Sequence, residues 1–109
     1  MTYDRSKDPT GTANANSSGA ARNWYNLQAS QIGAKELPAY GRSLRVRMGS
    51  AASVPLTMVV VPIDEANDAT TQTLIVDKTE YVPYGVRRIV SLNGGTTLPT
   101  GISIDVITK

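Results

Sequence analysis

The chain contains neither histidine nor cysteine. Without histidine it lacks the commonest general base near neutral pH and the commonest nitrogen ligand for metals. Without cysteine, thiol nucleophiles, thiolate metal sites and disulfide bonds are excluded. Serine and threonine are plentiful, but their hydroxyls need an activating base, and Lys35, Lys78 and Lys109 lie in no recognisable motif. These absences argue against an enzyme and against a resident cofactor or metal.

Aromatic residues and long apolar stretches are also scarce. The chain of 109 residues has no phenylalanine and one tryptophan, which predicts one small core made mainly of aliphatic side chains. The longest nearly continuous apolar run, Val59 to Ile63, is far shorter than the roughly 20 residues of a membrane-spanning helix. Nothing resembles a signal peptide. We therefore expect a soluble protein made in a cytoplasm, with no membrane partner.

Apolar and polar residues alternate with a period of two in several short stretches, which is typical of half-buried strands. Strands are predicted over residues 43–48, 54–61, 70–76, 86–92 and 102–108, and one more could lie within 24–40. No long amphipathic helix is evident. The predicted fold class is all-β, an antiparallel β-sandwich or small barrel with an extended polar N-terminal arm.

The same alternation assigns side chains to faces of the predicted strands. Leu44, Val46 and Met48 are expected on one face, with Arg45 and Arg47 on the other. The residues expected to share a face elsewhere are Val54, Leu56, Met58 and Val60; then Val86, Arg88, Val90 and Leu92; and finally Ile102, Ile104 and Val106, with Ile107 pointing outward.

The start of the chain differs in composition from the rest. Its first 19 residues have almost no large apolar side chain, so they cannot offset the entropy of ordering the backbone. We predict an arm over residues 1–30 and a single β domain over residues 31–109. Trp24, Tyr25 and Leu27 are candidate anchors on a partner, since aromatic residues dominate interface hot spots. Alternatively, Trp24 covers the open end of its own β core.

The run Asn93 to Thr97 raises the question of a phosphate-binding loop. Such a loop requires a following lysine and helix, whereas Leu98, Pro99 and an alternating stretch follow here. Asn-Gly and Gly-Gly favour the positive φ angles of hairpin turns. We therefore expect a turn that allows the last strand to pair with the strand before it.

Two groups of acidic residues are weak candidates for sites. Asp64, Glu65 and Asp68 carry oxygen ligands suited to calcium, but the rest of a calcium loop is missing, and a solvated loop is favoured. Asp77 and Glu80 have the residue types of a glycosidase pair, yet the sequence shows neither a cleft nor a raised pKa. Neither group indicates a catalytic or metal site.

Arginine and tyrosine provide the remaining binding candidates. Basic residues near Tyr40, Tyr81 and Tyr84 would suit a nucleic-acid-binding barrel, but a net charge of +2 argues against a nucleic-acid partner. Strand arginines more commonly protect sheet edges or form salt bridges between subunits. A further alternative is a glycan or host-surface binding module that uses Tyr81 and Tyr84. The candidate interface residues are Trp24, Tyr25, Leu27, Arg42, Arg45, Arg47 and Arg87.

Two stretches carry a resemblance to a known family. "LPAYGRSLRVRMGSA" (Leu37 to Ala51) and "VPYGVRRIVSLNGGTTLPTGISIDVI" (Val82 to Ile107) resemble the head-spike-base and capsid-decoration proteins of tailed phages and gene transfer agents. The resemblance implies a non-enzymatic, β-rich virion protein that forms a homo-oligomer on the major capsid protein or another virion protein. It implies no catalytic residue and no cofactor. The expected location is the virion, after synthesis in the host cytoplasm.

Overall fold

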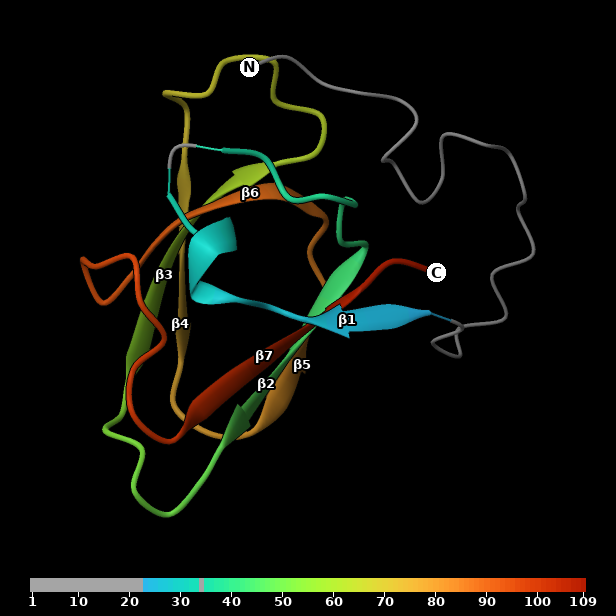
Figure 1. Cartoon of the computed structure of the whole chain (residues 1–109). Coiled ribbons are helices and arrows are strands. Elements are labelled where there is room, and N and C mark those ends of the chain that lie inside the picture. The colour runs from blue at the N-terminus through green and yellow to red at the C-terminus, as the bar shows by residue number, and fades with distance from the viewer. Residues whose placement is uncertain (1–22, 34) are drawn as a thin grey trace.

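The chain folds into two antiparallel β-sheets that pack against each other (Figure 1). The computed structural model describes residues 23–33 and 35–109. Sheet A has the order β1-β7-β2-β5 and sheet B the order β4-β3-β6. The strands are β1 (Trp24–Asn26), β2 (Ser43–Met48), β3 (Leu56–Pro62), β4 (Gln72–Val76), β5 (Glu80–Val82), β6 (Val86–Leu92) and β7 (Ile102–Ile107), and one 3-10 turn, η2, spans Ala29–Gln31. The predicted all-β sandwich is confirmed.

Sheet A follows the predicted alternation in its two central strands. Leu44 and Val46 of β2 lie opposite Val106 and Ile104 of β7, and all four side chains are buried. Ile107 lies on the outer face with Asp105, as predicted, but it is only 4% exposed. It lies in register between Trp24 on β1 and Ser43 on β2, and directly opposed side chains cover one another on the same face of a sheet.

Sheet B departs from simple alternation in β6. Val59 pairs with Ser91 and Val60 with Ile89, so Val90 is an extra residue between them, and a second register shift follows Val61. A bulge of this kind moves the following side chains to the other face. The prediction that Val86, Arg88, Val90 and Leu92 share one face is therefore wrong: Val86, Ile89 and Leu92 are buried, whereas Arg88 and Val90 are partly exposed.

Two predicted strands begin earlier than the observed strands, and one observed strand was not predicted. β3 begins at Leu56, and Val54, predicted to lie on its inner face, precedes the strand and is 55% exposed. β4 begins at Gln72 instead of residue 70. The short strand β5 was not predicted, because it has only three residues before Pro83, too few for a recognisable alternation.

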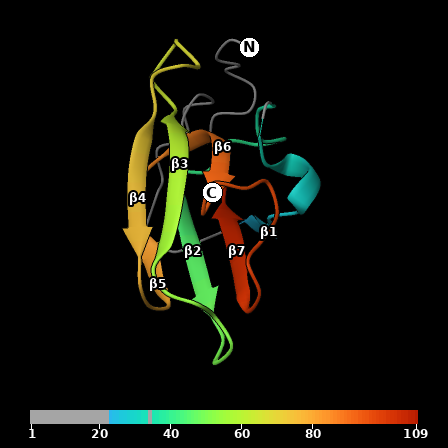
Figure 2. The ribbon, with the colours of Figure 1, turned by 90° about the vertical axis from the view of Figure 1, so that its left-hand side faces the viewer.

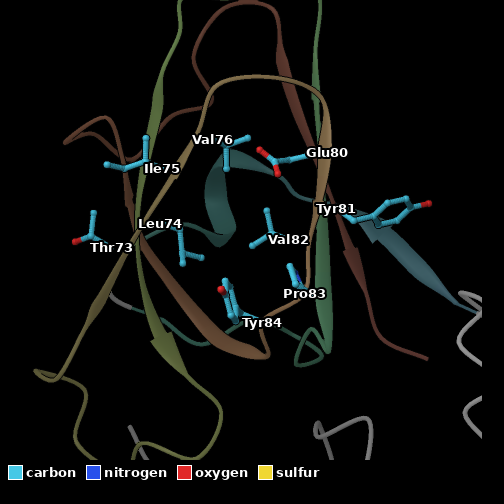
Figure 3. Close-up of a pocket in the computed structure, with 9 residues that line it drawn as sticks. All are labelled: Thr73, Leu74, Ile75, Val76, Glu80, Tyr81, Val82, Pro83 and Tyr84. Carbon is cyan, nitrogen blue, oxygen red and sulfur yellow. The ribbon is translucent and has the colours of Figure 1, made fainter.

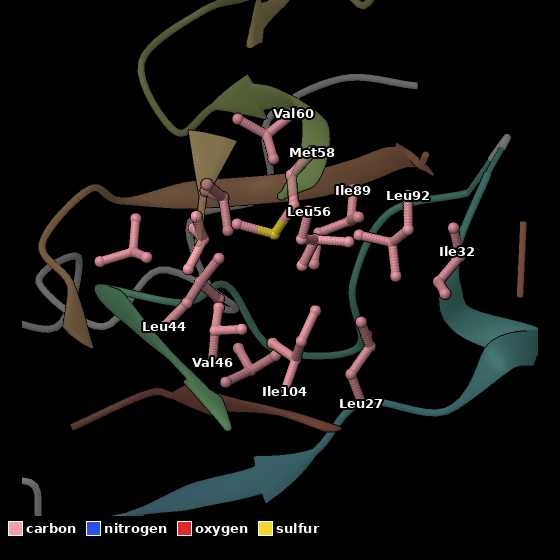
Figure 4. Packing of buried hydrophobic residues seen from close by; sticks show 14 of the residues in the cluster. Leu27, Ile32, Leu44, Val46, Leu56, Met58, Val60, Ile89, Leu92 and Ile104 are labelled. Carbon is pink, nitrogen blue, oxygen red and sulfur yellow. The ribbon is translucent and has the colours of Figure 1, made fainter. Parts of the chain in front are cut away.

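The core lies between the two sheets and consists of aliphatic side chains and Met58 (Figure 4). Both sheets and the segment between β1 and β2 contribute to it. Leu27, Ile32 and Leu37, from that segment, cover one end of the core and are at most 5% exposed. The absence of phenylalanine is thus accommodated by close packing of small branched residues.

The predicted turn at Asn93 is confirmed, but it does not pair the last two strands. Asn93 and Gly94 have φ angles of 50° and 80°, and Leu92 and Gly95 exchange two backbone hydrogen bonds of 2.9 and 3.0 Å. This is the geometry of a two-residue hairpin turn. Only Gly95 completes the hairpin, since the chain then crosses to sheet A, where β7 pairs with β1 and β2.

The predicted N-terminal arm falls mainly on residues 1–22, outside the described residues. The described part of the predicted arm, residues 23–30, belongs to the sandwich, because β1 pairs with β7 and Leu27 is completely buried. Within residues 23–33 and 35–109, no helix has the length and apolar character needed to cross a membrane.

Candidate functional site

A groove lies between β4 and β5, the strands at the same side of the two sheets (Figure 2). Its volume is about 320 Å³, and its lining consists of residues 73–76 and 80–84. Each of these strands pairs on one side only, β4 with β3 and β5 with β2. The groove is therefore bordered by two sheet edges.

Most side chains that line the groove are apolar, but polar atoms make up the larger part of its exposed surface (Figure 3). Leu74 and Val82 point into it from opposite strands, and Tyr84 closes one end. Ile75 and Tyr81 point away from it and are 68% and 61% exposed. Glu80 supplies the only carboxylate of the lining. Asp77 does not line the groove, so Asp77 and Glu80 do not form a facing acid pair there.

The outer face of sheet A brings together several of the predicted interface residues. Arg45 lies in register between Tyr81 on β5 and Asp105 on β7, and its guanidinium carbon is 5.9 Å from the centre of the Tyr81 ring. Arg47 forms a salt bridge of 3.1 Å with Asp105. Trp24, on β1, is 57% exposed. We call Trp24, Arg45, Arg47 and Tyr81 the sheet-A patch.

The other predicted anchors lie elsewhere. Tyr25 is half-buried, and its hydroxyl donates a hydrogen bond of 2.9 Å to the Ala39 carbonyl oxygen. Burial raises the pKa of Tyr25, so its hydroxyl stays protonated at neutral pH. Arg42 is partly buried. Leu27 is completely buried in the core of its own sandwich, so the prediction that it anchors a partner is wrong for this fold.

Arg87, the last predicted interface residue, is completely buried. Its Nε and Nη2 donate to the Glu65 carbonyl oxygen at 3.0 and 2.7 Å, and its Nη2 lies 2.6 Å from Asp68 Oδ1. Its Nη1 lies 3.4 Å from Glu36, which also accepts a hydrogen bond from the Tyr40 hydroxyl. Arg87 therefore stabilises its own fold, and the prediction of an exposed interface role is corrected.

The buried arginine also explains the acidic loop between β3 and β4. Asp68 bridges Arg87 and Arg88, with its Oδ2 at 3.0 Å from the Arg88 Nη1. Glu65 contributes its backbone carbonyl oxygen. In the described ranges, no group of three acidic residues is arranged to hold a metal ion. The calcium alternative thus has no geometric support in this part of the chain.

The residues considered for nucleic-acid binding are divided between the surface and the interior. Tyr40 and Arg87 are completely buried, whereas Arg47, which is paired with Asp105, lies on the outer face of sheet A. Arg45 lies on the same face and places its guanidinium over the Tyr81 ring. No pattern in the sequence indicated the groove, because β5 was not recognised as a strand.

Comparisons with protein-family models, with curated proteins and with solved structures find no match to this chain.

Proposed function

We propose that this protein is a non-enzymatic structural subunit of a phage particle, of the capsid-decoration or head-spike-base type. It oligomerises and attaches to the particle surface through its β domain and its N-terminal residues. The resemblance to that family provides the biological context. Its two stretches contain both central strands of sheet A and one edge strand of sheet B: Leu37 to Ala51 contains β2, and Val82 to Ile107 contains β7 and β6.

The single observation that carries the proposal is the sheet-A patch. Its exposed aromatic residues lie on the outer face of sheet A at opposite edges, Trp24 on β1 and Tyr81, beside Arg45, on β5. Tryptophan, tyrosine and arginine are the residues most enriched at interface hot spots. A sheet is also a rigid support, so these side chains need little reordering when a partner binds.

Cosedimentation of the purified protein with particles that lack it tests the proposal. Tyr81→Ala and Trp24→Ala should each lower the affinity for particles by about tenfold or more, since hot-spot residues contribute about 2 kcal/mol or more. Tyr84→Ala is the matched control, because Tyr84 is similarly exposed, at 57%, but lines the groove instead. No binding of the unmodified protein to any phage particle protein would contradict the proposal.

A second candidate function, glycan binding, is favoured by the groove itself. Tyr84 and the Glu80 carboxylate line one groove, and they provide a ring face and a hydrogen-bond acceptor for a sugar. Binding of the isolated protein to a glycan array, lost in Tyr84→Ala and retained in Tyr81→Ala, would support this function. Cosedimentation with particles that is lost in Tyr81→Ala and retained in Tyr84→Ala would instead support particle attachment.

A further inference from the structure

The outer edge of β4 carries backbone groups that point away from the sheet. On the neighbouring strand β3, Thr57 directs its N–H and C=O toward Asn93, with two hydrogen bonds of 2.8 Å. Backbone directions alternate along a strand, so Leu56, Met58 and Val60 direct theirs toward β4. Their partners there are Val76, Leu74 and Gln72. It follows that the N–H and C=O groups of Thr73 and Ile75 point off the open edge.

This edge lacks the protection found at the other sheet edges. No charged residue and no proline occurs from Ala69 to Val76, and Ile75 is 68% exposed. Natural proteins usually protect an edge strand by charge, proline, short length or a covering segment. β1 and β5 each have only three residues, and Pro83 follows β5.

The edge of β6 is protected by a covering segment. Gly33 N–H donates to the Ile89 carbonyl oxygen and Leu37 N–H to the Arg87 carbonyl oxygen, at 2.8 and 2.9 Å, and Gly41 bridges Val86. Among the described edge strands, β4 is therefore the one that is longer than three residues and has no segment paired along its outer edge.

We infer that β4 is the surface on which a second copy of this chain docks, by antiparallel pairing of the two β4 strands about a two-fold axis at Leu74. In this register Thr73 of each copy lies opposite Ile75 of the other. Both residues direct their backbone groups outward, so each pair exchanges both N–H···O hydrogen bonds. The two Leu74 side chains meet on the groove side, where Leu74 already points (Figure 3).

Three features favour a second copy as the occupant. The edge is self-complementary in its hydrogen-bond pattern, and its lack of charge avoids repulsion between identical strands. Pairing joins two three-stranded sheets into one continuous sheet. A five-residue edge also buries less than the roughly 800 Å² per partner of a stable complex. Such a weak contact suits copies held close together on a repetitive particle, where effective concentration is high. The inference thus rests on the proposed function for its setting.

Disulfide cross-linking tests the register in a chain that has no cysteine of its own. Leu74→Cys places the two thiols on the axis, where facing Cβ atoms are within about 4.5–5.5 Å, so oxidation should give a covalent dimer. Thr73→Cys is the register control, since Thr73 of the second copy lies diagonally from it. Tyr84→Cys, just after β5, is the control for the other side of the groove and lies outside the sheet-A patch. The cross-linking rates of the three variants are compared at high protein concentration and on particles. The inference is overturned if Leu74→Cys cross-links no faster than the two controls under both conditions.

A proline substitution tests the role of the outward N–H groups. Ile75→Pro removes an N–H that does not bond to β3, which edge strands tolerate. Ile75→Thr keeps that N–H and is the matched control. In sedimentation velocity, we expect Ile75→Pro to weaken self-association at least about tenfold and Ile75→Thr to retain most of it. Circular dichroism checks that each variant is folded. If Ile75→Pro does not fold, the cross-linking of the cysteine variants tests the inference instead.

The two proposals fail in different ways. A protein that self-associates and cosediments with particles, but whose association is unchanged in Ile75→Pro, overturns the β4 contact and leaves the proposed function intact. A Leu74→Cys variant that cross-links rapidly, in a protein that never binds particles, supports the β4 contact and overturns the particle role.

Discussion

At the scale of single residues, Arg87 has the most unusual environment. Burying a guanidinium is costly unless its charge is paired and its N–H groups are hydrogen-bonded. Glu36 and Asp68 pair with the charge, and the Glu65 carbonyl oxygen accepts from Nε and Nη2, whereas Nη1 faces Glu36 at 3.4 Å without a hydrogen bond. These groups come from the loop after β3 and the segment before β2, so one side chain fixes two connections to β6.

Arg87→Met should lower the free energy of unfolding by about 3–5 kcal/mol, because it leaves buried Glu36 without its cation. Arg47→Met is the control: its salt bridge with Asp105 is partly exposed, so the change should be within about 1 kcal/mol. Urea unfolding monitored by the fluorescence of Trp24 measures both. Equal losses in the two variants would refute the stabilising role of Arg87.

Two glycines with the same φ of 80° allow a second comparison. An added Cβ at Gly94 meets nothing within 4 Å, whereas at Gly101 it would lie 2.7 Å from the Ala52 backbone nitrogen. Gly94→Ala should therefore cost about 1 kcal/mol from backbone strain alone. Gly101→Ala should cost clearly more, because backbone must move. Thermal unfolding midpoints of the two variants check the order, and a smaller shift for Gly101→Ala would contradict it.

At the scale of elements, β1 is attached to the rest of the sandwich partly through Tyr25. Burial raises the pKa of its phenol in the folded state, whereas the unfolded value is about 10. Above pH 10 the unfolded chain therefore binds fewer protons than the folded chain, and the free energy of unfolding falls as pH rises. Below pH 10 this contribution is complete.

Tyr25→Phe should reduce the loss of stability between about pH 9.5 and 11, since the titrating group is gone. Ile75→Thr, an exposed substitution that removes no titrating group, should leave that loss unchanged. Urea unfolding at several pH values in this range gives the measurement. An unchanged pH dependence in Tyr25→Phe would show that another group causes the loss.

The elements also show what local sequence can predict. β2 and β7 were recognised with their inward faces because regular strands repeat every two residues. β6 was recognised at its correct bounds, but its buried face was not, since bulges depend on the pairing partner β3. The burial of Arg87 and the groove at β5 arise from contacts between segments distant in sequence, which no local pattern records.

At the scale of the whole molecule, self-association and stability should be linked. If native copies pair through β4 and unfolded chains do not, stability rises with protein concentration, by about 1.4 kcal/mol when the concentration is ten times Kd. The thermal midpoint of the unmodified protein should therefore increase with concentration, and that of Ile75→Pro should not. Calorimetry over a wide concentration range checks this, and a constant midpoint at concentrations where dimers form would contradict it.

Gly33, Leu37 and Gly41, which hydrogen-bond along β6, limit how far such pairing can proceed. Once two β4 strands have joined, both ends of the combined sheet terminate in a β6 whose edge is already hydrogen-bonded. In the part of the chain that the structure describes, this sheet then offers no free edge to a further copy, so we expect pairing through β4 to stop at two copies instead of continuing into a fibre. The covered β6 edge would thus confine an aggregation-prone edge at β4 to a closed pair.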